Sequence, residues 1–84
     1  MDFSKTWENI VRCAGQEFRT KTGKPFSYTI ENGAVVPDRT RYPLAKSNFE
    51  KAAAIENLRG PGQISDLVRG PSYVYAILTD SRIR

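Results

Sequence analysis

The sequence FSYTIENGAVVP, residues 26–37, decides the fold of this chain. Its first half alternates apolar with polar residues, which is the period of a half-buried β-strand. Asn32 and Gly33 follow at the point where this alternation stops. Both central residues of a type I′ turn need positive φ, and Asn-Gly is a pair that adopts this conformation readily. The stretch therefore predicts a β-hairpin with a two-residue loop.

This loop also determines which residues lie opposite each other. It pairs Ile30 with Val35 and Tyr28 with Pro37, and it places the four side chains on one face. Pro37 lacks the N–H group that a central strand needs, so this strand ends there or runs along an edge. Residues 17–22 show the same alternation and are followed by a glycine turn. We therefore expect a three-stranded antiparallel meander.

Helical patterns flank the meander on both sides. Apolar residues within 3–14 recur with the period of an amphipathic helix. After the meander, the SNFE stretch at 47–50 has the spacing of a capping box, which predicts a helix over 48–57. Two shorter helical segments are expected at 64–68 and 71–78, because glycine and proline interrupt the apolar spacing between them.

The order of these elements predicts an α+β domain, with an N-terminal helix, a three-stranded antiparallel meander, then one longer and two short C-terminal helices. A chain of 84 residues has room for one core, so 1–84 is expected to form a single small domain. The expected core residues are Trp7, Ile10, Val11, Phe18, Phe26, Tyr28, Ile30, Val35, Phe49, Leu67, Val74 and Ile77.

The composition is that of a globular protein, with 39% hydrophobic and 26% charged residues. No apolar run is long enough to cross a bilayer, and the first residues lack the apolar stretch of a signal peptide. The single cysteine cannot form an internal disulfide, which is typical of a reducing compartment. We expect a cytoplasmic protein that does not associate with membranes.

The chain contains no histidine, which removes the commonest general base and metal ligand in proteins. The nine acidic residues are scattered singly, and no nucleophile lies at a recognisable spacing from a base. The sequence therefore predicts no catalytic residues, no metal site and no cofactor, so the protein is not expected to be an enzyme.

Cationic side chains are concentrated around the predicted hairpin. Between residues 19 and 46, six of the 13 cations meet two of the nine anions, and outside this window the charges balance. Arg and Lys bind phosphate oxygens, and an exposed tyrosine stacks on bases. We therefore expect a nucleic-acid-binding accessory or regulatory protein that uses a basic β-hairpin surface. The expected nucleic-acid-binding residues are Arg19, Lys21, Lys24, Arg39, Arg41, Tyr42 and Lys46.

Two alternatives remain open. Basic residues on edge strands also prevent aggregation between sheets and need no ligand. The C-terminal segments match the order of a helix-turn-helix, but the apolar run at 73–78 favours packing in the core or at a dimer interface. The second function is thus a protein–protein interaction module, a homodimer or an adaptor, whose surface would include Tyr73, Tyr75 and Ile83.

Overall fold

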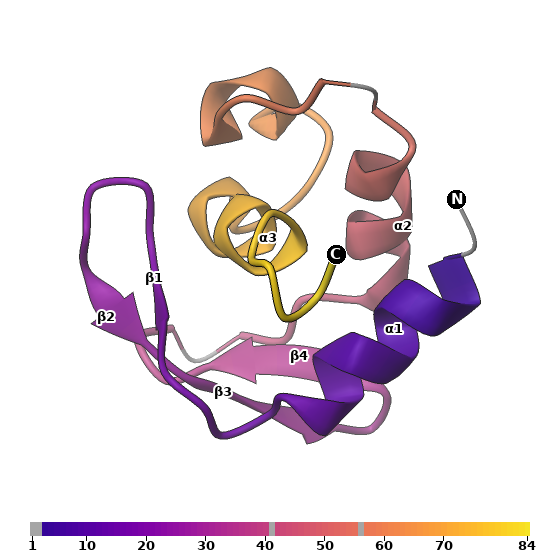
Figure 1. The fold of residues 1–84 in the computed structure, drawn as a ribbon, viewed down its shortest axis with the longest axis vertical. Coiled ribbons are helices and arrows are strands. Elements are labelled where there is room, and N and C mark those ends of the chain that lie inside the picture. The colour runs from indigo at the N-terminus through magenta and orange to yellow at the C-terminus, as the bar shows by residue number, and fades with distance from the viewer. Residues whose placement is uncertain (1–2, 41, 56) are drawn as a thin grey trace.

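A computed structural model describes residues 3–40, 42–55 and 57–84. The α+β class is confirmed, with helices packed over strands in two small sheets (Figure 1). In chain order the elements are α1 (Phe3–Arg12), β1 (Phe18–Arg19), β2 (Pro25–Phe26), β3 (Tyr28–Glu31), β4 (Ala34–Pro37), α2 (Lys46–Ala53), the 3₁₀ helix η1 (Pro61–Ile64) and α3 (Pro71–Leu78). Among the described residues, none of the helices combines the length and apolar character needed to cross a membrane.

The central hairpin has the predicted register. β3 and β4 are antiparallel, with Ile30 opposite Val35 and Tyr28 opposite Pro37. Asn32 and Gly33 have φ values of 52° and 76°, as a type I′ turn requires. The local turn chemistry therefore determines this part of the fold.

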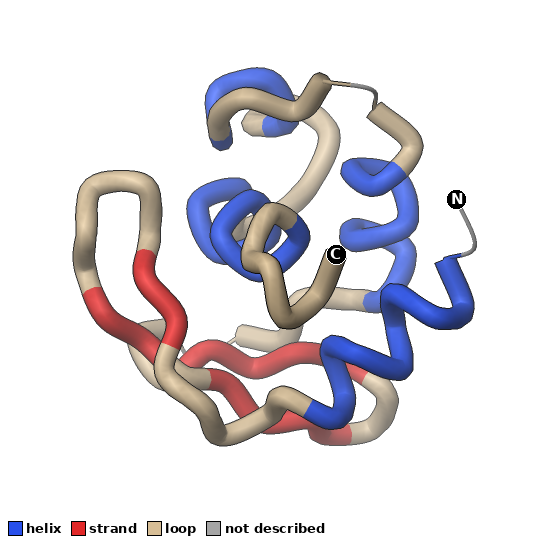
Figure 2. The backbone as a smooth tube through the Cα atoms, in the orientation of Figure 1, coloured by secondary structure: helices blue, strands red, loops and turns tan. Residues whose placement is uncertain are grey.

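The predicted three-stranded meander is wrong in two respects, because its first strand ends at Arg19 rather than at residue 22 and its middle strand is divided. β1 pairs with β2 and β3 pairs with β4, in two separate two-stranded sheets that meet at an angle (Figure 2). Ser27 lies between β2 and β3, and its amide donates to the Asp38 carboxylate at 3.1 Å. The Asp38 side chain thus replaces a backbone carbonyl as the partner of the Ser27 amide. The β1–β2 hairpin turns away from β3 and β4 at this point.

The predicted capping box at 47–50 does not form. α2 begins at Lys46 after Ala45, with no side-chain cap, and ends at Ala53 rather than at residue 57. Leu44 bridges Val35 in extended conformation, so the helix begins directly after this bridge. α2 has eight residues, as α3 has, and is therefore not the longer helix that was expected.

The first predicted short helix, at 64–68, does not form; these residues make a turn after the 3₁₀ helix η1, which shares only Ile64 with it. Proline opens η1, and the amides of Leu67 and Val68 both donate to the Ile64 carbonyl at 3.0 Å. The turn over 64–68 buries Ile64 and Val68 but leaves Leu67 47% exposed. Leu67 is therefore not the core residue that helical spacing predicts.

The core contains most of the expected residues and several others. Val11 is 43% exposed on α1, so its assignment to the core is wrong. Leu44 and Ile83 are fully buried, although neither lies in a clear apolar pattern. The other buried hydrophobic residues outside the expected core are Cys13, Ala52, Ile64, Val68, Ala76 and Leu78.

The C-terminal turn closes over the core. The Arg82 guanidinium lies 4.0 Å from the centroid of the Phe18 ring and donates to the Glu17 carbonyl at 2.9 Å. It also bonds both carboxylate oxygens of Asp80, which holds the pKa of that carboxyl below its usual value. The Asn9 amide donates to the Ile83 carbonyl at 3.1 Å, so this turn is also bonded to α1.

Tyr28 supplies a test of this packing. Its hydroxyl donates to the Ile10 carbonyl at 2.5 Å, and burial raises the pKa of the phenol well above its ordinary value of 10.0. The neutral phenol stabilises the fold fully below about pH 10, and this contribution is lost as the pH rises toward the raised pKa. We expect Tyr28 to ionise only at high pH or on unfolding, as measured by tyrosinate absorbance. Tyr28→Phe should remove this ionisation at high pH and lower the free energy of unfolding by about 1 kcal/mol. A tyrosinate absorbance curve that does not change would show that Tyr28 is not the tyrosine that ionises last.

Candidate nucleic-acid interface

The β1–β2 hairpin exposes the first group of predicted cations. Phe18 is buried, so Arg19, the next residue in β1, points to the opposite face. Its guanidinium donates to the Gly23 carbonyl at 3.2 Å and lies 3.3 Å from the Glu17 carboxylate. Lys24 is also exposed. The side chain of Arg19 therefore lies along the turn that carries Lys24.

The tip of this hairpin is attached to the body of the domain. The Lys21 ammonium donates to the Arg59 carbonyl at 3.2 Å, and the Tyr75 hydroxyl donates to the same carbonyl at 2.9 Å. A Cβ atom at Gly60 would lie only 3.0 Å from the Lys21 nitrogen. The hairpin tip thus meets the segment before η1, and Lys21 lies at the rim of the exposed hairpin surface.

The segment after β4 carries the second group of predicted cations, and one of them contacts the hairpin. Nε of Arg39 donates to the Pro25 carbonyl at 2.8 Å. Pro25 is the cross-strand partner of Arg19. Arg39 and Arg19 are therefore brought to the same part of the hairpin, although they are far apart in sequence. Arg41, which was predicted to join them, lies outside the described residues.

Tyr42 is 38% exposed, and the Arg69 guanidinium lies 5.0 Å from the centroid of its ring. This cation–π contact brings in a basic residue that was not predicted. The backbone explains the contact, because a Cβ atom at Gly70 would lie 2.9 Å from Cδ2 of Leu44. Glycine allows the two segments to approach closely. The sequence carries no short-range signal for a contact of this kind.

Lys46 does not lie with these residues. It begins α2, and its ammonium is 5.5 Å from the centroid of the Trp7 ring on α1. The cation–π contact places it beside the N-terminal helix rather than against the hairpin. We call the remaining described set the basic face, which consists of Arg19, Lys21, Lys24, Arg39, Tyr42 and Arg69.

Most cations of the basic face form no ion pair with the carboxylates that the structure describes. Across residues 3–40, 42–55 and 57–84, the ion pairs are Arg19–Glu17 and Arg82–Asp80. Lys24, Arg39 and Arg69 thus have no ion-pair partner among the described carboxylates. The same residues contain no cluster of metal-ligating side chains. The basic face is chemically suited to bind an anion, through two types of cationic group and one aromatic ring.

The alternative protein-interaction surface is not formed as predicted. Ile83 is fully buried, because the turn that follows Asp80 folds it into the core, so it is not part of any exposed surface. Tyr73 is half-buried, with its ring edge-on to Phe26 at 5.0 Å. Tyr75 is half-buried as well. Four of the eight residues of α3 are buried, which leaves it little surface to present to a DNA groove.

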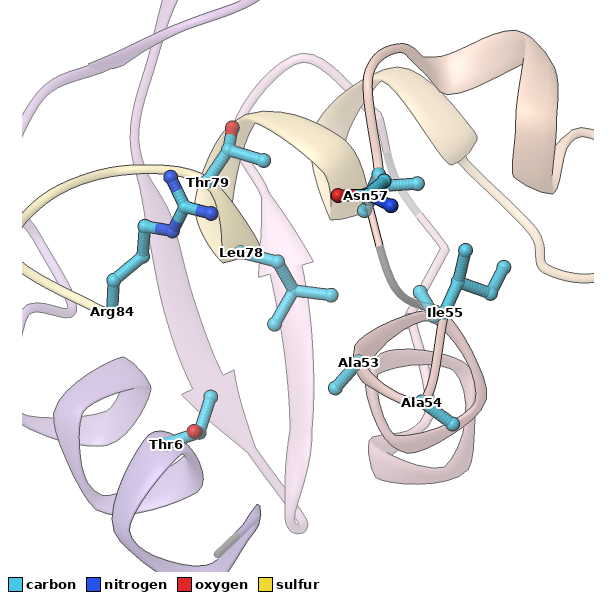
Figure 3. A pocket seen from close by; sticks show the side chains of 10 residues that line it. Thr6, Ala53, Ala54, Ile55, Asn57, Leu78, Thr79 and Arg84 are labelled. Carbon is cyan, nitrogen blue, oxygen red and sulfur yellow. The ribbon is translucent and has the colours of Figure 1, made fainter. Parts of the chain in front are cut away.

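A groove of about 580 Å³ lies between α1, the end of α2 and the C-terminal segment (Figure 3). Alanines and larger apolar side chains form much of its wall, with Thr6, Thr79 and Arg84 at its polar side. No residue of the basic face lines this groove. The groove and the basic face are therefore separate features of the described surface.

The fold and this surface define a small α+β domain with a cationic face that carries an exposed aromatic ring. No family model matches the chain, and it matches neither a curated protein nor a solved structure.

Proposed function

We propose that this protein is a non-catalytic accessory or regulatory protein that binds nucleic acid through the basic face. The observation that carries the proposal is the bond from Arg39 to the Pro25 carbonyl, opposite Arg19. This bond joins cations from two separate segments on one side of the domain. We assign Tyr42 and Arg69 to the same surface, since Tyr42 follows Arg39 by three residues in the chain and contacts Arg69.

Phosphate is the anion that fits this surface best. The guanidinium groups offer planar donors that bind two phosphate oxygens, and the ammonium groups act as mobile point charges. Folded domains normally neutralise clustered charges or spread them out, since like charges repel. Bound phosphate groups would offset the repulsion between neighbouring cations of the basic face. Affinity should then come mainly from the release of counterions.

The structural observations favour nucleic acid over the protein-interaction alternative. The expected protein-interaction surface loses Ile83 to the core, and the hydroxyl of Tyr75 bonds within the domain. We place the protein in the cytoplasm, where Cys13, its single cysteine, would remain reduced.

The salt dependence of binding tests this proposal. Fluorescence anisotropy of labelled single-stranded DNA, single-stranded RNA and duplex DNA should be measured at several salt concentrations. Contacts from the five cations of the basic face should give a log–log slope with a magnitude of about 3 to 5 for the strand type that binds best. If none of the three binds at low salt, or if the slope is below about 1, phosphate recognition by the basic face is refuted.

A further inference from the structure

We infer that the ligand is single-stranded nucleic acid, and that one base stacks on the platform formed by Tyr42 and Arg69. This inference rests on the proposed function and makes it more specific. It names the strand type and the residue pair that meets a base, which phosphate binding alone leaves open.

The geometry of the pair carries the first step. Tyr42 is 38% exposed, and the Arg69 guanidinium lies over its ring, 5.0 Å from the centroid. An aromatic ring and a guanidinium plane are the two groups on which proteins stack unpaired bases. The contact with Arg69 also restricts the orientation of the ring, so less entropy is lost when a base binds. The pair is thus a preorganised platform at the surface.

The neighbours of the platform supply the contacts that a single strand needs. Arg39 lies three residues before Tyr42 and is bonded to the hairpin that carries Arg19 and Lys24. A strand with one base on Tyr42 would place its neighbouring phosphates among these cations. Grooves that bind single strands combine these two features, a cationic track and stacking aromatic side chains.

The structure also disfavours duplex recognition. Bases in a duplex are already stacked, so their faces are closed to a tyrosine ring. A protein that reads a duplex inserts a helix or a β-ribbon into a groove. α3 is largely buried, and the tip of the β1–β2 hairpin is bonded to the Arg59 carbonyl through Lys21. Neither element projects freely from the domain.

The size of the domain limits the site. Its largest extent is 27 Å, so the basic face covers a short segment, near the lower end of the roughly 4- to 16-nucleotide range of known single-strand modules. An oligonucleotide of about 12 nucleotides is therefore long enough for a test. The same sequence, annealed to its complement, supplies a matched duplex.

The test compares these two ligands with three forms of the protein, the wild type, Tyr42→Ala and Tyr42→Phe. We expect the wild type to bind the single strand more tightly than the duplex. Tyr42→Ala should lower single-strand affinity about tenfold, within the range measured for loss of one stacked base. Its salt slope should not change, because no charge is removed. Tyr42→Phe should bind like the wild type, because the ring remains.

A fluorescent base analogue in the strand gives a second readout. Stacking on Tyr42 should quench 2-aminopurine in complexes with the wild type and Tyr42→Phe, but not with Tyr42→Ala at saturating protein. Equal thermal unfolding midpoints for the three forms exclude a general loss of folding. Tighter duplex binding, or an unchanged affinity and quenching for Tyr42→Ala, would overturn the inference while leaving the proposed function in place. No binding to either ligand would overturn both.

Discussion

Replacing Arg19, Lys24 and Arg39 together with Gln is expected to lower the affinity for a single strand about 100-fold at about 0.1 M salt. Each phosphate contact to a single strand contributes about 0.7 to the magnitude of the log–log salt slope. One contact therefore accounts for about a fivefold change in affinity between about 0.1 and 1 M salt. Three lost contacts should therefore also reduce the magnitude of the slope by about 2. Anisotropy titrations at several salt concentrations measure both quantities.

A matched triple variant supplies the control. Lys5 and Arg12 on α1 and Lys51 on α2 are exposed, and Figure 1 shows these helices across the domain from the β1–β2 hairpin. Replacing these three with Gln removes the same charge from a different surface, so affinity should change by less than about threefold, given that phosphate contacts and not net charge dominate. An equal loss in both triple variants would show that net charge alone drives binding. The basic face would then have no special role.

Leu44→Ala is expected to have the largest effect on stability. Leu44 is fully buried, its backbone bonds Val35 in both directions, and Gly70 packs against its side chain. Removing a buried leucine side chain loses apolar burial and leaves a cavity, at a cost of about 3 to 5 kcal/mol in unfolding free energy. Urea unfolding at neutral pH measures this cost. In a domain of this size, the loss is a large fraction of the total stability.

Leu67→Ala is the control for this substitution. It deletes the same atoms from a side chain that is 47% exposed, and it should cost less than about 1 kcal/mol. Leu44 also anchors the segment that carries Arg39 and Tyr42, so the folded fraction of Leu44→Ala should bind nucleic acid more weakly than Leu67→Ala. Equal unfolding free energies for the two variants would contradict the packing described for Leu44.

The sequence predicts local features of this fold well. Asn32 and Gly33 determine a turn whose geometry depends on its own two residues, so the register of β3 and β4 follows directly. The buried aromatic residues of the strands follow from the alternation of apolar and polar side chains. These features depend on neighbours within a few residues.

Features that depend on distant partners could not be predicted in this way. The division between β2 and β3 involves the Asp38 carboxylate, which bonds the Ser27 amide from eleven residues away. Leu44 is buried because of its bridge to Val35 and its contact with Gly70. Alternation and helical spacing carry no information about such contacts.

The candidate site shows the same limit. Arg19 was predictable, since it follows the buried Phe18 in β1, whereas Lys21 and Lys24 lie in the loop between β1 and β2. The contact between Tyr42 and Arg69 depends on a close approach of two segments at a glycine, which no local pattern indicates. Lys46 was grouped with the hairpin by sequence proximity, whereas the start of α2 directs it toward Trp7.

The location of the binding surface is the central claim, and an NMR titration tests it most directly. Amide chemical shifts of the ¹⁵N-labelled protein would be followed as a short single-stranded oligonucleotide is added. We predict that the largest shift changes occur in residues 19–24, in 39–40 and 42, and at Arg69, and that α1 stays unchanged. Changes concentrated on α1 or around the groove beside α2, or no changes at low salt, would contradict nucleic-acid binding by the basic face.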